Sequence, residues 1–183
     1  MKKIFLVMAS AFLVMTASAQ MKEKTVEVGG AAMYPSKNIV ANAVNSADHT
    51  TLVAAVKAAG LVETLQSAGP FTVFAPTNAA FGKLPAGTVE TLVKPENKAT
   101  LTKILTYHVV AGKFDAKSIA ALIKEGNGTA TLRTVAGGEL KASMKGKKLI
   151  LTDEKGGMSV VTIADVYQSN GVIHVVDTVV LPS

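Results

Sequence analysis

Hydrophobic residues recur at helical spacing through much of the first two thirds of the chain. The first stripe, at i, i+3, i+4 and i+7, predicts a helix with one buried face, capped by Ser46 or Asp48 and ended by Gly60. Three shorter stripes at i, i+3 and i+4 predict further short helices, the last of them capped by Asp115. The stripes are Leu52/Ala55/Val56/Ala59, Val89/Leu92/Val93, Leu101/Ile104/Leu105 and Ile119/Leu122/Ile123.

The pattern then changes to the alternation that is typical of strands. Leu140, Ala142 and Met144 alternate with polar residues, which predicts a strand with one solvent-exposed face. Further strands are predicted at Leu149–Thr152, Met158–Val166 and Val172–Leu181. The last run is apolar on both faces, so it should be a central strand. Helices followed by strands, with no internal repeat, predict a single domain of the α+β class.

The block Phe71–Phe81 predicts a strand, a turn and a helix start in direct succession. Its first residues are strong strand formers that alternate between two faces. Pro76 has no N–H to donate, so the strand should end there. The side chain of Thr77 or Asn78 can then accept a hydrogen bond from a free N–H in the first turn of the next helix.

The start of the chain has the features of an export signal. Lys2 and Lys3 precede an apolar stretch that is too short to span a bilayer, and Ala17-Ser18-Ala19 fits a cleavage site. We expect a signal peptide over residues 1–19 that is cleaved after Ala19, with an uncleaved signal anchor as the alternative. Residues 20–37 have no helical period and few large apolar residues, and they predict a flexible linker to a domain over residues 38–183.

Composition removes several classes of function. The chain has no cysteine, which excludes thiol catalysis and thiolate metal sites. The net charge is +6, of which Lys2 and Lys3 supply two, and only 5% of residues are aromatic, so base stacking with nucleic acid is not expected. The three histidines lack zinc-binding spacing, and no Gly-x-Ser-x-Gly elbow occurs. We expect no metal, no cofactor and no enzymatic activity.

Three segments, in order along the chain, resemble the signatures of the fasciclin domain family: Phe71–Phe81, Tyr107–Gly112 and Asn170–Pro182. The resemblance covers about residues 38–183. It implies a compact fasciclin-like β-sandwich of two sheets flanked by several short helices, and a role in adhesion. The positions expected to build this scaffold are Phe74, Pro76, Thr77, Asn78, Phe81, His174 and Asp177.

The Tyr-His segment admits two interpretations. In animal members of the family this segment is implicated in integrin-mediated adhesion, so the resemblance implies an adhesion patch here. The matching positions are Tyr107, His108, Val109 and Val110. The alternative is structural: the helical stripe that begins at Leu101 reaches His108 at i+7, which would point the imidazole inward. A buried imidazole needs a hydrogen-bond partner, and we expect the turn around Thr77 or Asn78 to provide it.

Lysines gather around one predicted hairpin, at Lys141, Lys145, Lys147 and Lys148. One interpretation is a solvated face, because lysines on edge strands also prevent unwanted strand pairing. The other is a docking site for anionic glycans or lipid headgroups, which salt would weaken.

Together these features predict a secreted or periplasmic adhesion module without catalytic activity. Its expected partner is a cell-surface or matrix protein or polysaccharide, not nucleic acid, and no transmembrane segment is expected after signal cleavage. An exported glycan-, lipid- or small-molecule-binding protein is the main alternative, and an exported hydrolase is a weaker one. The sequence leaves the oligomeric state open.

Overall fold

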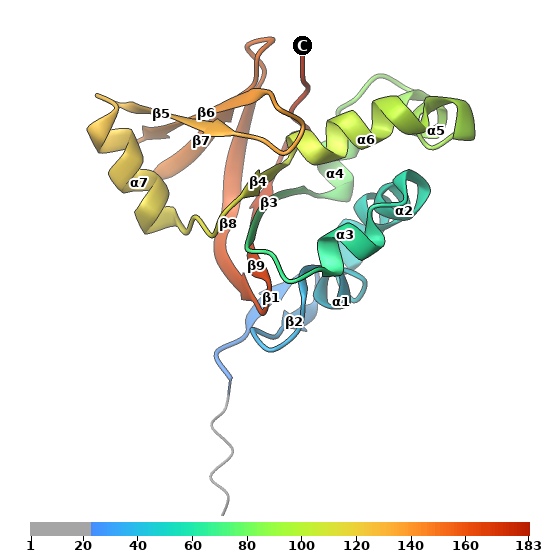
Figure 1. The fold of residues 1–183 in the computed structure, drawn as a ribbon, viewed down its shortest axis with the longest axis horizontal. Coiled ribbons are helices and arrows are strands. Elements are labelled where there is room, and N and C mark those ends of the chain that lie inside the picture. The colour runs from blue at the N-terminus through green and yellow to red at the C-terminus, as the bar shows by residue number, and fades with distance from the viewer. Residues whose placement is uncertain (1–22) are drawn as a thin grey trace, which may run out of the picture.

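The structure, a computed structural model, describes residues 23–183 (Figure 1). The expected signal peptide and its cleavage site lie outside the described residues. The helices are α1 (Ile39–Ala43), α2 (Thr50–Ala59), α3 (Val62–Gln66), α4 (Asn78–Gly82), α5 (Thr88–Leu92), α6 (Lys98–Tyr107) and α7 (Ala116–Glu125), with two 3₁₀ turns, η1 (Ala47–His49) and η2 (Pro95–Asn97). Among these residues, no helix is long and apolar enough to cross a membrane.

Seven strands form one hydrogen-bonded sheet in the order β4-β3-β9-β8-β7-β6-β5. They are β3 (Phe71–Pro76), β4 (Val109–Ala111), β5 (Thr129–Arg133), β6 (Glu139–Lys145), β7 (Lys148–Thr152), β8 (Met158–Gln168) and β9 (Gly171–Val176). Strands β3 and β9 pair in parallel, and the other neighbours are antiparallel.

The long strand β8 joins the two halves of the sheet. Its register with β9 shifts twice, between Val161 and Ile163 and between Ile163 and Val166, and such irregularities bend a strand. A single bridge between Val110 and Thr134 also links β4 to the residue that follows β5. The two sheets expected from the sequence are therefore two halves of one bent sheet, and the predicted α+β class is confirmed.

The bent sheet separates two hydrophobic cores. The first core lies between β3, β9 and helices α1, α2, α3, α4 and α6, which gather on one side of the long strands in Figure 1. The second core lies beneath α7, between that helix and strands β5, β6 and β7. Strand β3 serves both cores, because Val73 and Ala75 face the first while Phe74 faces the second.

Several predicted boundaries are confirmed. Helix α2 ends at Gly60, which has the left-handed φ of 73° that glycine adopts without strain. Thr77 caps α4 by accepting a hydrogen bond from the Ala80 N–H at 3.2 Å, and Asp115 caps α7 by accepting one from the Ser118 N–H at 2.8 Å. The predicted caps of α2 are wrong, because Ser46 lies before η1 and makes no side-chain cap bond there.

The predicted last strand is too long. Strand β9 ends at Val176, whereas the sequence predicted a strand to Leu181. The next residue explains the end: the Asp177 carboxylate accepts a hydrogen bond from the Val160 N–H at 2.9 Å, where a continuing ladder would use a backbone carbonyl. The chain therefore leaves the ladder at Asp177, although Val179 and Val180 remain buried.

The predicted linker over residues 20–37 is wrong from Val26 onward. Strands β1 (Val26–Val28) and β2 (Ala31–Met33) form a hairpin whose turn, Gly29-Gly30, has φ values of 58° and 73°. Positive φ at both central residues is what a hairpin turn of type I′ requires. The side chains of Val28 and Met33 are buried in the first core, so this segment belongs to the domain.

Candidate functional site

The Tyr-His segment lies inside the protein. It runs from the last turn of α6 into β4, and its members Tyr107, His108, Val109 and Val110 are only 0%, 2%, 5% and 3% exposed. A side chain without accessible surface cannot contact a partner. The prediction that these four residues form an adhesion patch is therefore wrong for the fold as described.

Tyr107 joins α6 to the second half of the sheet. Its hydroxyl donates a hydrogen bond to the Glu139 carbonyl at 2.6 Å and accepts one from the Glu154 N–H at 3.2 Å. Burial, as the largest cause, raises the pKa of Tyr107 to about 12, so the hydroxyl keeps its proton at neutral pH and remains a donor. The side chain therefore links α6 to the backbone of Glu139 and of Glu154, which are 32 and 47 residues further along the chain.

His108 ties α6 to the C-terminal segment. Its Nε2 accepts a hydrogen bond from the Val180 N–H at 3.1 Å, so in the neutral ring Nδ1 carries the proton and donates to the Ile104 carbonyl at 2.9 Å. Burial lowers the pKa of His108 to about 4, which keeps the ring neutral near pH 7. The inward orientation agrees with the helical stripe, but the predicted partner, the turn at Thr77 or Asn78, is wrong.

The other signature side chains make contacts within the fold. Phe74 stacks on His174 with ring centroids 5.6 Å apart, and His174 Nε2 donates a hydrogen bond to the Phe114 carbonyl at 2.8 Å. Asn78 accepts a hydrogen bond from the Thr51 N–H at 3.0 Å. Asp177 lies 3.4 Å from the ammonium of Lys83. Pro76 and Phe81 are buried as well.

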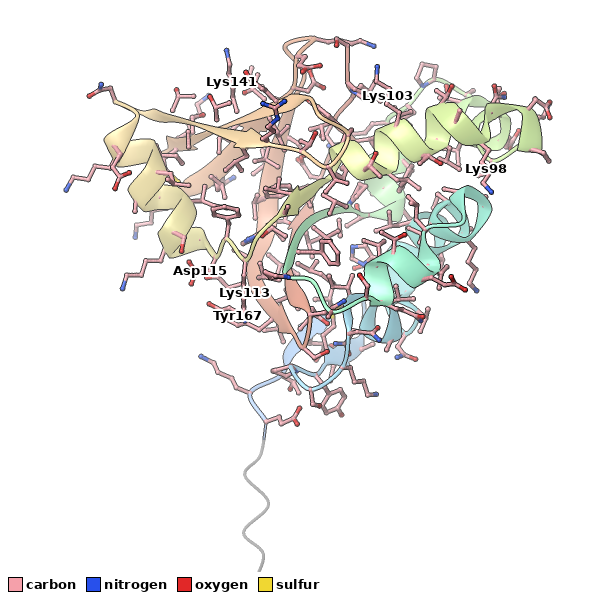
Figure 2. All side chains as sticks on the ribbon, in the orientation of Figure 1. Lys98, Lys103, Lys113, Asp115, Lys141 and Tyr167 are labelled. Carbon is pink, nitrogen blue, oxygen red and sulfur yellow. The ribbon has the colours of Figure 1, made fainter. Side chains whose placement is uncertain are left out.

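The lysine hairpin, defined as Lys141, Lys145, Lys147 and Lys148 on β6, β7 and their turn, is exposed throughout. Figure 2 shows Lys141 projecting from β6 away from the core. Gly146, with a φ of 62°, allows the tight turn that brings the lysines together. Among residues 23–183 the salt bridge between Lys83 and Asp177 is the one present, so no carboxylate forms an ion pair with the lysine hairpin.

Two of these lysines face each other across the strands. Lys145 is the direct register partner of Lys148, and side chains in that relation have Cβ atoms about 5 Å apart. Like charges directly opposite one another destabilise a sheet. Glu154, an acidic residue at the far end of the hairpin, does not compensate, because its carboxylate accepts hydrogen bonds from the N–H groups of Glu139 and Ser183, each at 2.9 Å.

The described part of the chain shows no group of three or more histidine, cysteine, aspartate or glutamate side chains that could hold a metal ion. Sequence reasoning missed one feature, an apolar cavity under the helices of the first core. Its wall combines residues from many separate elements, so no local pattern in the sequence could have revealed it.

The molecule is an α+β domain with one bent, seven-stranded sheet and a buried Tyr-His segment. The chain belongs to the fasciclin family, since the fasciclin domain matches residues 47–182. A FAS1 domain pair from the insect cell adhesion molecule fasciclin I has the same fold, with a TM-score of 0.71 and 18% sequence identity over 81% of this chain and 52% of that one.

Several relatives are similar over most of the chain. Protein sll1483 of Synechocystis sp. is 49% identical over 166 residues, which cover 91% of this chain and 85% of that protein. Immunogenic protein MPB70 of Mycobacterium bovis is 37% identical over 76% of this chain and 66% of its own length. Transforming growth factor-beta-induced protein ig-h3 of Sus scrofa is 38% identical over 72% of this chain, but over only 17% of its own length.

Proposed function

We propose that this protein is an exported, non-enzymatic adhesion module that binds acidic polysaccharide at a cell surface through the lysine hairpin. The observation that carries the proposal is the opposed pair Lys145 and Lys148, exposed and without a carboxylate partner. Such a pair opposes folding, and a polyanion lying across the hairpin would relieve the repulsion.

The shape of the hairpin fits a linear polyanion. Lys141 and Lys145 are four residues apart on one strand and therefore on the same face, about 13 Å from one another along the chain direction. Lys148 faces Lys145 across the hairpin and Lys147 lies in the turn. The charges therefore extend along a ridge, and a chain with repeated carboxylates can meet several of them at once.

The relatives support a role outside the cytoplasm. One solved structure with this fold comes from an insect cell adhesion molecule, and a relative with 38% identity over 67% of this chain is called a cell surface glycolipoprotein. The proposed export rests on the expected signal peptide over residues 1–19. Intact-mass measurement of the protein secreted by its host would test it, with a mature chain that begins at Gln20 as the expected result.

Affinity chromatography on immobilised polygalacturonate, with the purified chain from Gln20, tests the binding directly. The double variant Lys145→Gln/Lys148→Gln should elute at a clearly lower salt concentration than the wild type. Its control is Lys117→Gln/Lys124→Gln, which removes the same charge from two exposed positions on α7. Binding should weaken strongly between 0.15 M and 1 M salt, because the Debye length falls from about 8 Å to about 3 Å.

Stability measurements distinguish lost binding from lost folding. Removal of the opposed charges should leave the free energy of unfolding unchanged or slightly higher, since a repulsion disappears. Equal loss of binding in both double variants would show that only net charge matters, and it would overturn the assignment to the lysine hairpin. Retention that persists at 1 M salt would also count against it.

A further inference from the structure

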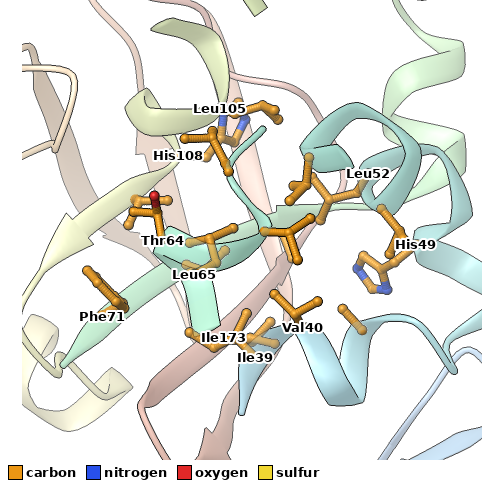
Figure 3. A pocket seen from close by; sticks show the side chains of 18 of the residues that line it. Ile39, Val40, His49, Leu52, Thr64, Leu65, Phe71, Leu105, His108 and Ile173 are labelled. Carbon is orange, nitrogen blue, oxygen red and sulfur yellow. The ribbon is translucent and has the colours of Figure 1, made fainter. Parts of the chain in front are cut away.

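An apolar cavity of about 70 Å³ lies within the first core (Figure 3). Its wall includes Ile39 from α1, Leu52 and Val56 from α2, Leu65 from α3, Leu105 from α6 and Ile173 from β9. The surface that these side chains present to the enclosed space is apolar. Cavities of this kind exclude water and accept hydrocarbon, so the chemistry of the wall selects against glycans and charged groups.

The same wall contains an unpaired nitrogen. His49 is 1% exposed, and its Nδ1 lies 2.9 Å from the Ser46 hydroxyl. Its Nε2 is the one buried side-chain nitrogen or oxygen among residues 23–183 without a hydrogen-bond partner. Burial lowers the pKa of His49. This effect outweighs the nearby Ala75 carbonyl, which acts to raise the pKa. No polar atom contributes to the cavity surface, so this nitrogen lies behind the apolar surface of the wall and makes no contact with the enclosed space.

The cavity reaches the surface beside α2 and α3. Three residues of its lining are exposed: Lys57 in the last turn of α2, Thr64 in α3, and Val135 after β5. Leu61, between the first two, is half-buried. Lys57 forms no ion pair in the described part of the chain. The opening therefore joins an apolar interior to a free ammonium group at the rim.

We propose that this cavity binds a medium-chain fatty carboxylate, with the alkyl chain inside and the carboxylate at Lys57. A water needs roughly 10–15 Å³ of such space, so a 70 Å³ cavity encloses about five to seven heavy atoms. Octanoate matches this size, since seven carbons can lie inside while the carboxylate stays at the rim. A lipid with two acyl chains exceeds the enclosed space, which favours a free fatty acid.

Calorimetric titration at pH 7 with octanoate, and with 1-octanol as the uncharged counterpart, tests both parts of the proposal. Lys57→Gln should weaken octanoate binding about two- to fivefold, the range of an exposed ion pair, and leave 1-octanol unchanged. The matched control is Lys124→Gln, which alters an exposed lysine in the last turn of α7, another ten-residue helix. Equal effects of Lys57→Gln on both ligands would overturn the role of the carboxylate.

A second variant tests where the chain lies. Ala43→Phe, at a half-buried position of the wall, should abolish binding of both ligands, whereas Ala58→Phe, at an exposed position of α2 outside the wall, should not. Methyl NMR of the wild type needs no variant to fold. Octanoate should shift the signals of Ile39 and Ile173 but not those of Ile119 and Ile123 in the second core. No binding at millimolar octanoate, or binding that survives Ala43→Phe, would refute the site.

Discussion

Removing only the hydroxyl of Tyr107 should destabilise the fold and leave surface binding intact. The ring is 0% exposed, and the hydroxyl bonds the Glu139 carbonyl at 2.6 Å and the Glu154 N–H at 3.2 Å. Tyr107→Phe keeps the ring but leaves both backbone groups without this partner. Two hydrogen bonds at about 0.5–1.5 kcal/mol each give an expected loss of about 1–3 kcal/mol.

Urea denaturation at pH 7 measures this loss, and a thermal scan should show the same effect. For a domain of this size, 1 kcal/mol shifts the melting temperature by about 2–4 °C, so a decrease of about 2–12 °C is expected. Tyr34→Phe is the control, because Tyr34 is 40% exposed and its hydroxyl makes no hydrogen bond in the described structure. That variant should stay within about 0.5 kcal/mol of the wild type.

Binding to polygalacturonate provides the opposite test for Tyr107. If the side chain is structural, Tyr107→Phe should elute from the matrix at the salt concentration of the wild type. An unchanged free energy of unfolding together with weaker binding would refute the structural role, and it would restore the Tyr-His segment as a contact surface.

Two further predictions concern acid and capping. The folded pKa of His108 is about 4 against an ordinary value of 6.5, so between these values the unfolded chain binds more protons. The free energy of unfolding should therefore fall by up to about 3 kcal/mol from pH 7 to pH 4, and by less in His108→Phe. Urea denaturation at several pH values measures this, and a pH-independent wild type would contradict it. Thr77→Ala removes the cap of α4 and should cost about 1 kcal/mol by the same assay, whereas Thr77→Ser should cost little; equal stability of Thr77→Ala and wild type would refute the cap's contribution.

Local rules in the sequence predicted α2, α4, α5, α6 and α7 and several of their ends, but not α1 or α3. The stripe from Leu52 to Ala59 and the stop at Gly60 depend only on spacing and backbone freedom, and the caps Thr77 and Asp115 act on their own helices. The hairpin at residues 26–33 was missed because two three-residue strands carry too short a pattern, and their stability comes from contacts with the first core.

The burial of Tyr107 could not be inferred from the apolar stripe of its helix. Helix α6 lies between the two cores: Leu101, Ile104 and Leu105 pack in the first, whereas Tyr107 packs in the second. A single apolar stripe describes only the first contact and gives no sign that Tyr107 is buried on the other side. The partner of His108, Val180, is 72 residues away in sequence, and only the folded topology brings it into contact.

The three fasciclin signatures are distant in sequence but adjacent in space. Phe71–Phe81 contains β3, Tyr107–Gly112 contains β4, and Asn170–Pro182 contains β9. These strands are neighbours in the order β4-β3-β9. His108 in the second signature bonds the Val180 N–H of the third, and His174 bonds the Phe114 carbonyl just beyond the second. Many of the other signature side chains fill the two cores. The signatures therefore specify one half of the bent sheet, and they have little surface left for a partner.

Of the two proposed sites, the lysine hairpin lies wholly outside the signatures and the cavity only partly so. The lysine hairpin belongs to the other half of the sheet, on β6 and β7. The cavity opens beside α2 and α3, but signature residues such as Phe71, His108 and Ile173 also line it. Substitutions in either place can change charge or cavity shape without touching the bonds of Tyr107, His108 or His174. A scaffold of this kind can hold its fold while its ligands differ, so a shared fasciclin signature identifies the architecture and not the partner.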